Sequence, residues 1–276
     1  MTYCVAMCLD EGLVCLSDSR TNAGVDHINT FRKMTVFERA GDRVLVLMSA
    51  GNLAITQAVV SILREHAAVQ DRESLWNAPT LFECARLVGD TIRRVHHRDA
   101  AALKEFGVDF NASFILCGQI GDEPPRLFNI YSAGNFIEAS ADTPYFQIGE
   151  SKYGKPIVDR VINRTTSLDE AAKCALISMD STIRSNLSVG LPLDLLLYRR
   201  DSLKVARHVS IDWGHPYFEM IHSQWGASLR RVFGELPDPD WNAWPVAEQR
   251  SAVGGGQDGE GAAGVVVGLP AAPRPE

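Results

Sequence analysis

The sequence contains no apolar run that approaches the roughly 20 residues needed to cross a lipid bilayer. Its first twenty residues also lack the basic start and long apolar core of a signal peptide, because Asp10 and Glu11 interrupt them. We therefore expect a cytoplasmic protein that has no membrane partner.

Signatures of metal, disulfide and nucleotide sites are also missing. The six cysteines form no CxxC pair, the seven histidines form no H-E-x-x-H pattern, and there is no P-loop. Three cysteines fall inside apolar strand-like runs, where a free thiol behaves as a small hydrophobic group. We expect reduced cysteines in the core, no metal, no cofactor and no ATP hydrolysis by the chain itself.

Positive charge is in short supply. The formal net charge is −7, which argues against nucleic acid as a partner because phosphate binding needs a basic surface. What is present is an ordinary globular composition, 46% hydrophobic and 22% charged. With 276 residues the chain can bury a sizeable core, in one large domain or two small ones.

The first fifty residues have the pattern of two strand pairs. Residues 2–9 and 12–20 flank a short Asp10-Glu11-Gly12 turn, and residues 33–39 and 43–50 flank a second turn. The period then changes, because apolar residues recur at helical spacing from Asn52 to about Val69.

Strands and helices then follow one another in groups. Capping boxes at Thr80–Glu83 and Ser167–Glu170 each predict the start of a helix. Further strands are predicted at 110–120, 126–134, 191–200 and 203–210, and further helices at 153–163 and 218–233. Runs of strands separated by helix pairs favour two packed antiparallel sheets with helices outside. We assign residues 1–248 to this domain and predict a disordered Gly/Ala/Pro-rich tail at 249–276.

Thr2 directly follows the initiator methionine at the start of the first predicted strand. A threonine hydroxyl is a poor nucleophile unless a base lies beside it, and the α-amine of the same residue can be that base. This amine has an ordinary pKa of about 7.7–8.0, which suits proton transfer at neutral pH. It exists only after Met1 is removed. Many proteins begin Met-Thr without consequence, so Thr2 needs further residues around it.

Two charged residues are candidates to support Thr2. If the first two strands pair, residue 18 lies opposite residue 2 within a position or two. A carboxylate such as Asp18 at the end of an apolar strand needs a partner, which is Lys33, Arg20 or a loop cap. Lys33 follows a polar loop from Thr21 to Arg32. Its ammonium would favour a threonine alkoxide if Asp18 held it in place; the alternative is a solvated lysine at a strand start.

Gly51 lies in the stretch SAGN, at the predicted junction of a strand and a helix. Unpaired backbone N–H groups gather at such a junction and can donate to a developing oxyanion. Glycine also lets a substrate approach the backbone closely. The alternative is a plain strand-to-helix turn.

These residues together resemble a known family. The stretch GLVCLSDSRTNAG, Lys33 thirteen residues after Arg20, and SAGNLAITQ are similar to the proteasome-type N-terminal nucleophile hydrolases. The resemblance is strongest to the bacterial ancestral β-subunit group, Anbu, whose members begin with the same Met-Thr-Tyr pattern. It covers roughly residues 2–235.

The resemblance implies an α+β fold, a four-layer αββα sandwich, in which Thr2 is the nucleophile and its freed amine is the base. It implies that Asp18 and Lys33 support Thr2 and that Gly51 contributes to the oxyanion hole. Four more residues match family positions that shape the specificity pocket or assist the amine: Ser49 and Leu53 for the pocket, and Ser151 and Ser188 for the amine.

Two departures from the family pattern affect the amine. The family has an aspartate three residues before the second serine, where this chain has Ser185, and the neighbouring Asn186 is a candidate substitute. The chain also begins with no propeptide, so we expect an aminopeptidase to expose Thr2.

The resemblance implies a threonine-type peptidase that acts on peptides or proteins within a homo-oligomer, either a ring or a spiral, with a separate unfoldase as a further partner. Two alternatives stay open at this point. One is a catalytically silent proteasome-fold structural subunit. The other is a small-molecule amidase or acyltransferase of the same fold.

Overall fold

A computed structural model describes residues 2–22, 28–68 and 73–244 of the chain. The chain divides into two compact units, the larger of which ends at Ala227 and contains every strand described below. The predicted tail at 249–276 lies outside the described residues.

The first sheet has five antiparallel strands with the amino-terminal hairpin at its centre. In spatial order the strands are β10 (Tyr145–Gly149), β1 (Tyr3–Leu9), β2 (Gly12–Asp18), β11 (Leu193–Arg199) and β12 (Arg207–Ile211). Cys4 pairs with Ser17 and Leu9 pairs with Gly12, so residue 18 lies beside residue 3. The predicted hairpin and its register are confirmed.

The second sheet is also antiparallel, and it follows the chain order. Its strands are β5 (Met34–Arg39), β6 (Arg43–Gly51), β7 (Ala112–Ile120), β8 (Arg126–Ile130) and β9 (Phe136–Glu138). β6 ends at Gly51 and the following helix begins at Leu53, which confirms the predicted junction.

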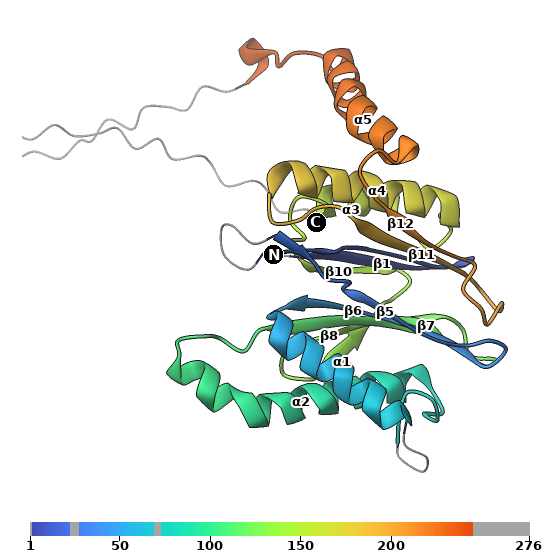
Figure 1. Cartoon of the computed structure of the whole chain (residues 1–276). Helices are drawn as coiled ribbons and strands as arrows, with labels where there is room; N and C mark the ends of the chain where they lie inside the picture. Colours follow the sequence, from blue (N-terminus) through green and yellow to red (C-terminus); the bar gives the residue numbers. More distant parts are fainter. Residues whose placement is uncertain (1, 23–27, 69–72, 245–276) are drawn as a thin grey trace, which may run out of the picture. The chain divides into compact units, whose positions relative to one another are not determined.

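Helices cover the outer face of each sheet (Figure 1). α1 (Leu53–Ala68) and α2 (Leu81–Glu105) pack on the second sheet, and α3 (Lys155–Val161) and α4 (Leu168–Ser185) pack on the first. The larger unit is therefore the predicted αββα sandwich. α5 (Pro216–Glu235) begins in this unit, where its Phe218 and Ile221 join the core formed with the first sheet.

β1 and β2 read as continuous apolar runs because both of their faces are buried. Tyr3, Val5 and Met7 face the core under α3 and α4, whereas Cys4 and Ala6 face the second sheet. All six cysteines are buried and free, as predicted.

Of the two predicted capping boxes, one is complete and the other forms only one of its two hydrogen bonds. Ser167 and Glu170 form a complete capping box at the start of α4. At α2 the Thr80 hydroxyl accepts from the Glu83 backbone N–H at 3.2 Å, but the Glu83 carboxylate binds Arg86 instead of closing the box.

Three parts of the strand prediction are wrong. The polar stretch Thr21–Arg32 is not all loop, because β3 (Arg20–Asn22) and β4 (Ile28–Thr30) pair there. The strand predicted at 203–210 begins only at Arg207. The pattern also gives no strand between 135 and 152, yet β9 and β10 lie there. These strands are short or partly exposed, so they carry little apolar alternation.

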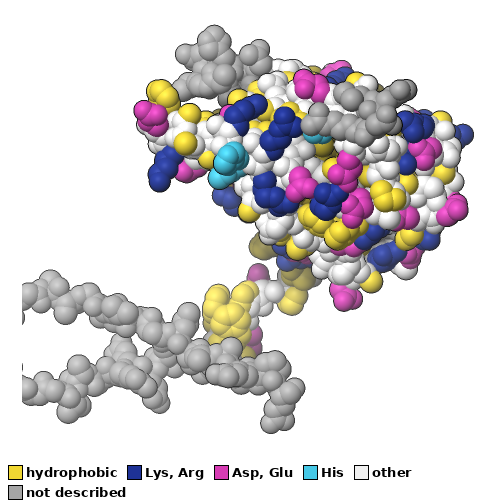
Figure 2. Space-filling view, turned by 90° about the horizontal axis from the view of Figure 1, so that it is seen from below, with side chains coloured by type: hydrophobic (Ala, Val, Ile, Leu, Met, Phe, Trp, Pro, Cys, Tyr) yellow, Lys and Arg dark blue, Asp and Glu magenta, His cyan; other side chains and the backbone are white. Residues whose placement is uncertain are grey.

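None of the described helices is both long and apolar enough to cross a membrane. On the face seen in Figure 2, basic and acidic side chains are interspersed. On α2, for example, Arg86 contacts Glu83 and Asp90, and Arg93 also contacts Asp90. Among the described residues on this face, acidic side chains interrupt the basic ones.

The smaller unit begins at Ser228 and contains the second half of α5. A 3-10 turn, Trp241–Ala243, follows and is capped by the Asp240 carboxylate. The rings of Trp241 and Trp244 meet edge to face with centroids 4.9 Å apart, and both side chains are exposed.

Candidate active site

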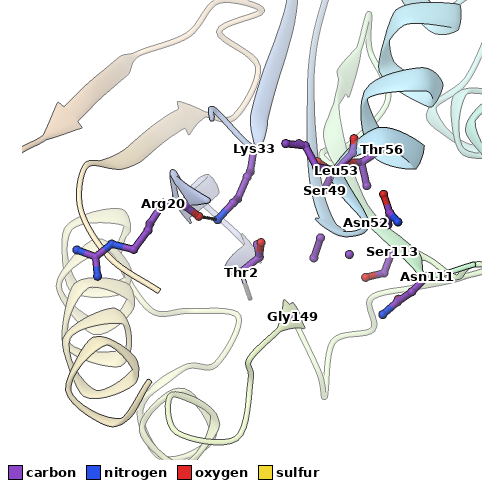
Figure 3. Close-up of a pocket in the computed structure, with 12 residues that line it drawn as sticks. Thr2, Arg20, Lys33, Ser49, Asn52, Leu53, Thr56, Asn111, Ser113 and Gly149 are labelled. Atoms are coloured by element: carbon purple, nitrogen blue, oxygen red, sulfur yellow. Dashed lines mark hydrogen bonds between the residues drawn. The ribbon is translucent and has the colours of Figure 1, made fainter. Parts of the chain in front are cut away.

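A cavity of about 630 Å³ opens beside the amino-terminal strand. Its volume lies in the range of small-molecule and peptide-side-chain sites. The described residues that line it are Thr2, Arg20, Lys33, Ser49, Ala50, Gly51, Asn52, Leu53, Thr56, Asn111, Ser113 and Gly149. Figure 3 shows Thr2 and Lys33 on one side of this cavity and Asn111 and Ser113 across from them. The structure therefore brings together five of the residues predicted from the sequence: Thr2, Lys33, Ser49, Gly51 and Leu53.

Asp18 lies behind Lys33 and fixes it. The Lys33 Nζ donates to Asp18 Oδ2 at 2.7 Å and to the Arg20 carbonyl at 2.6 Å. The other Asp18 oxygen accepts from the Tyr3 backbone N–H at 2.9 Å. Lys33 is only 6% exposed and Asp18 is fully buried. Of the partners considered for Asp18, the structure selects Lys33, and the solvated-lysine alternative is wrong.

Burial raises the pKa of the Asp18 carboxyl above its ordinary value. The Lys33 ammonium and the backbone N–H groups of Tyr3 and Gly190 oppose this shift, because they favour the charged carboxylate. Each charge of the pair therefore stabilises the other, and removal of either partner would leave an unpaired charge in a buried place.

Gly51 lets two strands meet at the mouth of the cavity. Its φ of +114° lies in the region that favours glycine, and a Cβ would come within 2.4 Å of the Asn111 carbonyl. The next backbone N–H, that of Asn52, donates to the same Asn111 carbonyl at 2.8 Å. Ser49 is held beside Lys33, because the Ser49 backbone N–H donates to the Lys33 carbonyl at 3.0 Å.

A second glycine, Gly149, brings β10 against the backbone of Thr2. Its φ is +82°, and a Cβ there would lie 2.0 Å from the Thr2 carbonyl oxygen. That carbonyl accepts the Glu150 backbone N–H at 2.7 Å. Sequence reasoning missed Gly149; the only signal is that the stretch Tyr145–Gly149 ends in glycine.

Ser151 and Ser188 are not among the described residues that line the cavity. Ser188 is linked to the Thr2 backbone through two other side chains. Its hydroxyl donates to Asn186 Oδ1 at 2.6 Å, and Asn186 Nδ2 donates to Glu150 Oε2 at 2.9 Å. Ser151 follows Glu150 directly, and its N–H donates to the Gly149 carbonyl at 3.1 Å.

The residue that stands where the family has an aspartate, and the residue after it, differ in their surroundings. Ser185 is exposed at the last position of α4, whereas the next residue, Asn186, joins Ser188 to the buried Glu150. The carboxylate on this side of the site is therefore that of Glu150, which also lies 3.6 Å from the Lys152 ammonium. Glu150 could not be singled out from the sequence, because nothing in the local pattern marks it as buried.

One side of the cavity was not predicted. It carries uncharged polar side chains from two elements and the residues just before them: Asn52 before α1, Thr56 in α1, Asn111 before β7 and Ser113 in β7. Asn52 could have been suspected from the SAGN stretch, where its Oδ1 caps α1 by accepting the Ala54 N–H at 3.0 Å. Asn111 and Ser113 reach the cavity only through the pairing of β6 with β7.

The two antiparallel sheets between helix layers, with Thr2 at the edge of a cavity, define the N-terminal nucleophile hydrolase fold. Comparison with known proteins specifies the family. A family model described as "Proteasome subunit" matches residues 2–190. The chain belongs to the proteasome subunit family.

Solved structures of Anbu, the ancestral β-subunit, are similar to this chain. The protein from Yersinia bercovieri is 54% identical with a TM-score of 0.81, and the match covers 87% of this chain and 99% of that one. A helical assembly of the Anbu complex from Pseudomonas aeruginosa is 50% identical with a TM-score of 0.83, covering 88% and 100%. An Anbu mutant from Hyphomicrobium sp. strain MC1 is 48% identical with a TM-score of 0.82, covering 87% and 100%. A comparison with curated protein sequences gives no match.

Proposed function

We propose that this chain is an N-terminal threonine hydrolase that cleaves amide bonds in peptides or proteins once Met1 has been removed. One observation carries the proposal. Thr2 lines the same cavity as Lys33, and the Lys33 ammonium is held at 2.7 Å by the buried carboxylate of Asp18. A buried lysine and aspartate with this geometry lower the energy of a nearby alkoxide, which is what a threonine nucleophile needs.

In the proposed reaction the Thr2 Oγ attacks the substrate carbonyl carbon while its proton moves to the α-amine of Thr2. The negative charge on the former carbonyl oxygen is met by the Gly51 backbone N–H. The C–N bond then breaks, the ammonium returns its proton to the leaving amine, and an ester links the acyl group to Thr2. Water attacks this ester with the amine again as base, which releases the acid and restores the hydroxyl.

Ser151 and Ser188 are proposed to orient the α-amine, with Asn186 in the role of the family aspartate. The hydrogen bonds from Ser188 through Asn186 to Glu150 support this assignment. Since Asn186 is neutral, the negative charge that favours a protonated amine would come from Glu150. Ser49 and Leu53 are proposed to contact the side chain of the substrate.

Assembly into a homo-oligomer is part of the proposal. The Pseudomonas aeruginosa relative forms a helical assembly, and this chain matches its full length at 50% identity. We expect the same kind of assembly here, with the site inside it, a cytoplasmic location, and a separate unfoldase for folded substrates.

The direct test is an intact mass measured before and after treatment with a peptide epoxyketone, a probe that reacts with an N-terminal threonine. We expect a mass that begins at Thr2 and a single adduct, and no adduct in Thr2→Ala. A preparation that retains Met1, or an adduct that persists in Thr2→Ala, would contradict the proposal.

The alternatives give different outcomes. A silent structural subunit would lose Met1 or keep it without ever forming an adduct. A small-molecule amidase would form the adduct but would cleave small amides and not peptides, so cleavage profiling of the two substrate types distinguishes it.

A further inference from the structure

The cavity beside Thr2 has no carboxylate among its described lining residues. Two basic residues belong to the lining, but only Lys33 lies beside Thr2, and its ammonium is already bound by Asp18. The Arg20 side chain points away from the cavity (Figure 3). Its Nη1 donates to the Leu187 carbonyl at 2.9 Å, and its guanidinium packs against Gly190.

A charged substrate side chain would therefore find no good partner in this cavity. A basic group would meet no carboxylate, and it would lie near the Lys33 ammonium. An acidic group would compete with Asp18 for an ammonium that is already paired. Both cases leave a charge poorly compensated in a partly enclosed place, which is unfavourable.

Uncharged hydrogen-bonding groups, by contrast, line the side of the cavity across from Thr2. Among the described residues, no hydrogen-bond partner occupies the Ser49 hydroxyl, the Ser113 hydroxyl or the side-chain amide of Asn111. The Asn52 amide is fixed in orientation because its Oδ1 accepts the Ala54 N–H at 3.0 Å. This leaves the Asn52 NH₂ as a donor beside hydroxyl groups that both donate and accept.

We infer that the cavity selects substrates in which the side chain next to the cleaved bond carries a neutral carboxamide, as in glutamine. A carboxamide both accepts and donates, so it matches a wall of amide and hydroxyl groups. The inference rests on the proposed function, because it assumes that Thr2 attacks the bond beside this side chain.

The test uses four peptide epoxyketones that are identical except for the side chain next to the warhead: glutamine, glutamate, lysine and methionine. Second-order rates of adduct formation are measured by intact mass. We expect the glutamine compound to react about fivefold faster than the methionine compound, because methionine cannot form the hydrogen bonds of the carboxamide. We expect it to react about tenfold or more faster than glutamate and lysine, because their charges are unpaired.

The variant Asn52→Asp sharpens the test. Aspartate keeps the oxygen that caps α1 but replaces the NH₂ donor with a negative charge. We expect the lysine compound to become the fastest and the glutamine advantage to disappear. The matched control is Asn163→Asp, since Asn163 Oδ1 also accepts a backbone N–H two residues on, from Thr165 at 2.9 Å, and lies outside this cavity. It should leave the order of rates unchanged.

The outcomes separate the inference from the function on which it rests. If none of the four compounds forms an adduct, the proposed nucleophile is wrong. If adducts form at equal rates, or if charged compounds react fastest with the natural chain, the nucleophile stands and the selectivity is refuted. An equal change of order in both aspartate variants would also refute it, because the effect would then come from overall charge.

Discussion

The two sides of the cavity are built in opposite ways. On the side of Thr2, Lys33 and Asp18 are buried and joined at 2.7 Å, and each has a further backbone partner. On the other side, Asn111 is exposed and Ser113 is partly exposed, and both are neutral. The fold satisfies the charged groups of the first side, whereas the second side keeps part of its hydrogen-bonding capacity free for a substrate.

This difference separates chemistry from recognition. A group that must stabilise a developing charge works best when the fold has already fixed it, because no reorganisation is needed during the reaction. A group that contacts a substrate has to remain without a protein partner. Changes on the charged side should therefore cost stability and reactivity together, and changes on the neutral side should alter selectivity alone.

The largest effect is expected for Asp18→Asn. It leaves the Lys33 ammonium in a buried place without its carboxylate, which should lower the free energy of unfolding by about 3–5 kcal/mol. Epoxyketone labelling of Thr2 should be lost as well. Chemical denaturation and intact mass measure the two effects.

The double variant Asp18→Asn/Lys33→Met is the control for Asp18→Asn. It removes both charges, so it should recover much of the lost stability while labelling stays absent. If the free energy of unfolding of Asp18→Asn lies within about 1 kcal/mol of that of the natural chain, the ion pair does not stabilise the fold as argued.

Gly51→Ala should have the next largest effect, because Gly51 is where the two sides of the cavity join. The new Cβ would lie 2.4 Å from the Asn111 carbonyl, in a backbone with φ of +114°. Gly41→Ala is a matched control, since its φ is +80° and nothing lies within 4 Å of the added Cβ. The control should cost about 1–2 kcal/mol through backbone strain. Gly51→Ala should cost about 1–3 kcal/mol more, because the neighbouring strand must shift. Equal costs would show that the close approach to Asn111 is unimportant.

The charged side of the site could be predicted from the sequence, and the neutral side could not. Thr2, Asp18, Lys33 and Gly51 all lie within the first 51 residues, and the hairpin pattern alone predicts that residue 18 lies opposite residue 2 within a position or two. Asn111, in contrast, lies at the cavity only because β6 pairs with β7. Pairing between segments sixty residues apart is decided by the packing of whole sheets, which no local pattern contains.

The fold shows the same division. β1 was predictable because it is apolar on both faces, and α4 because Ser167 and Glu170 form a capping box. β10 was not, because it is a five-residue edge strand in which Ile148 alone is buried. Its main signal is Gly149, whose role becomes visible only once the Thr2 carbonyl lies against it.

A smaller effect on the charged side concerns Tyr3, the residue after Thr2. Burial raises the pKa of its hydroxyl from 10.0 to about 12, although hydrogen bonds with Ser178 and Gln147 lower it. Because the folded pKa is raised, this contribution to stability is complete below pH 10 and is lost as the pH rises towards 12. Between pH 9 and 11 the loss of this contribution should lower the free energy of unfolding by about 1 kcal/mol.

Tyr3→Phe tests this pH dependence. Burial also raises the pKa of the Cys8 and Cys174 thiols to about 11, so the natural chain loses stability from these groups in the same range. The phenylalanine variant keeps those thiols and lacks the tyrosine, so its unfolding free energy should fall by about 1 kcal/mol less than that of the natural chain. Identical pH profiles would mean that Tyr3 ionises as freely in the folded protein as in the unfolded chain.

The smallest effect on stability is expected for Ser113→Ala, on the neutral side. The Ser113 hydroxyl has no hydrogen-bond partner among the described residues, so its removal should change the free energy of unfolding by less than about 0.5 kcal/mol. Ser178→Ala is the matched control, since that hydroxyl is fully buried and lies 2.6 Å from the Tyr3 hydroxyl. It should cost about 1 kcal/mol or more. Denaturation measures both variants. If Ser113→Ala costs as much as Ser178→Ala, the Ser113 hydroxyl stabilises the fold as much as a buried, hydrogen-bonded hydroxyl does, and the neutral side of the cavity is structural as well.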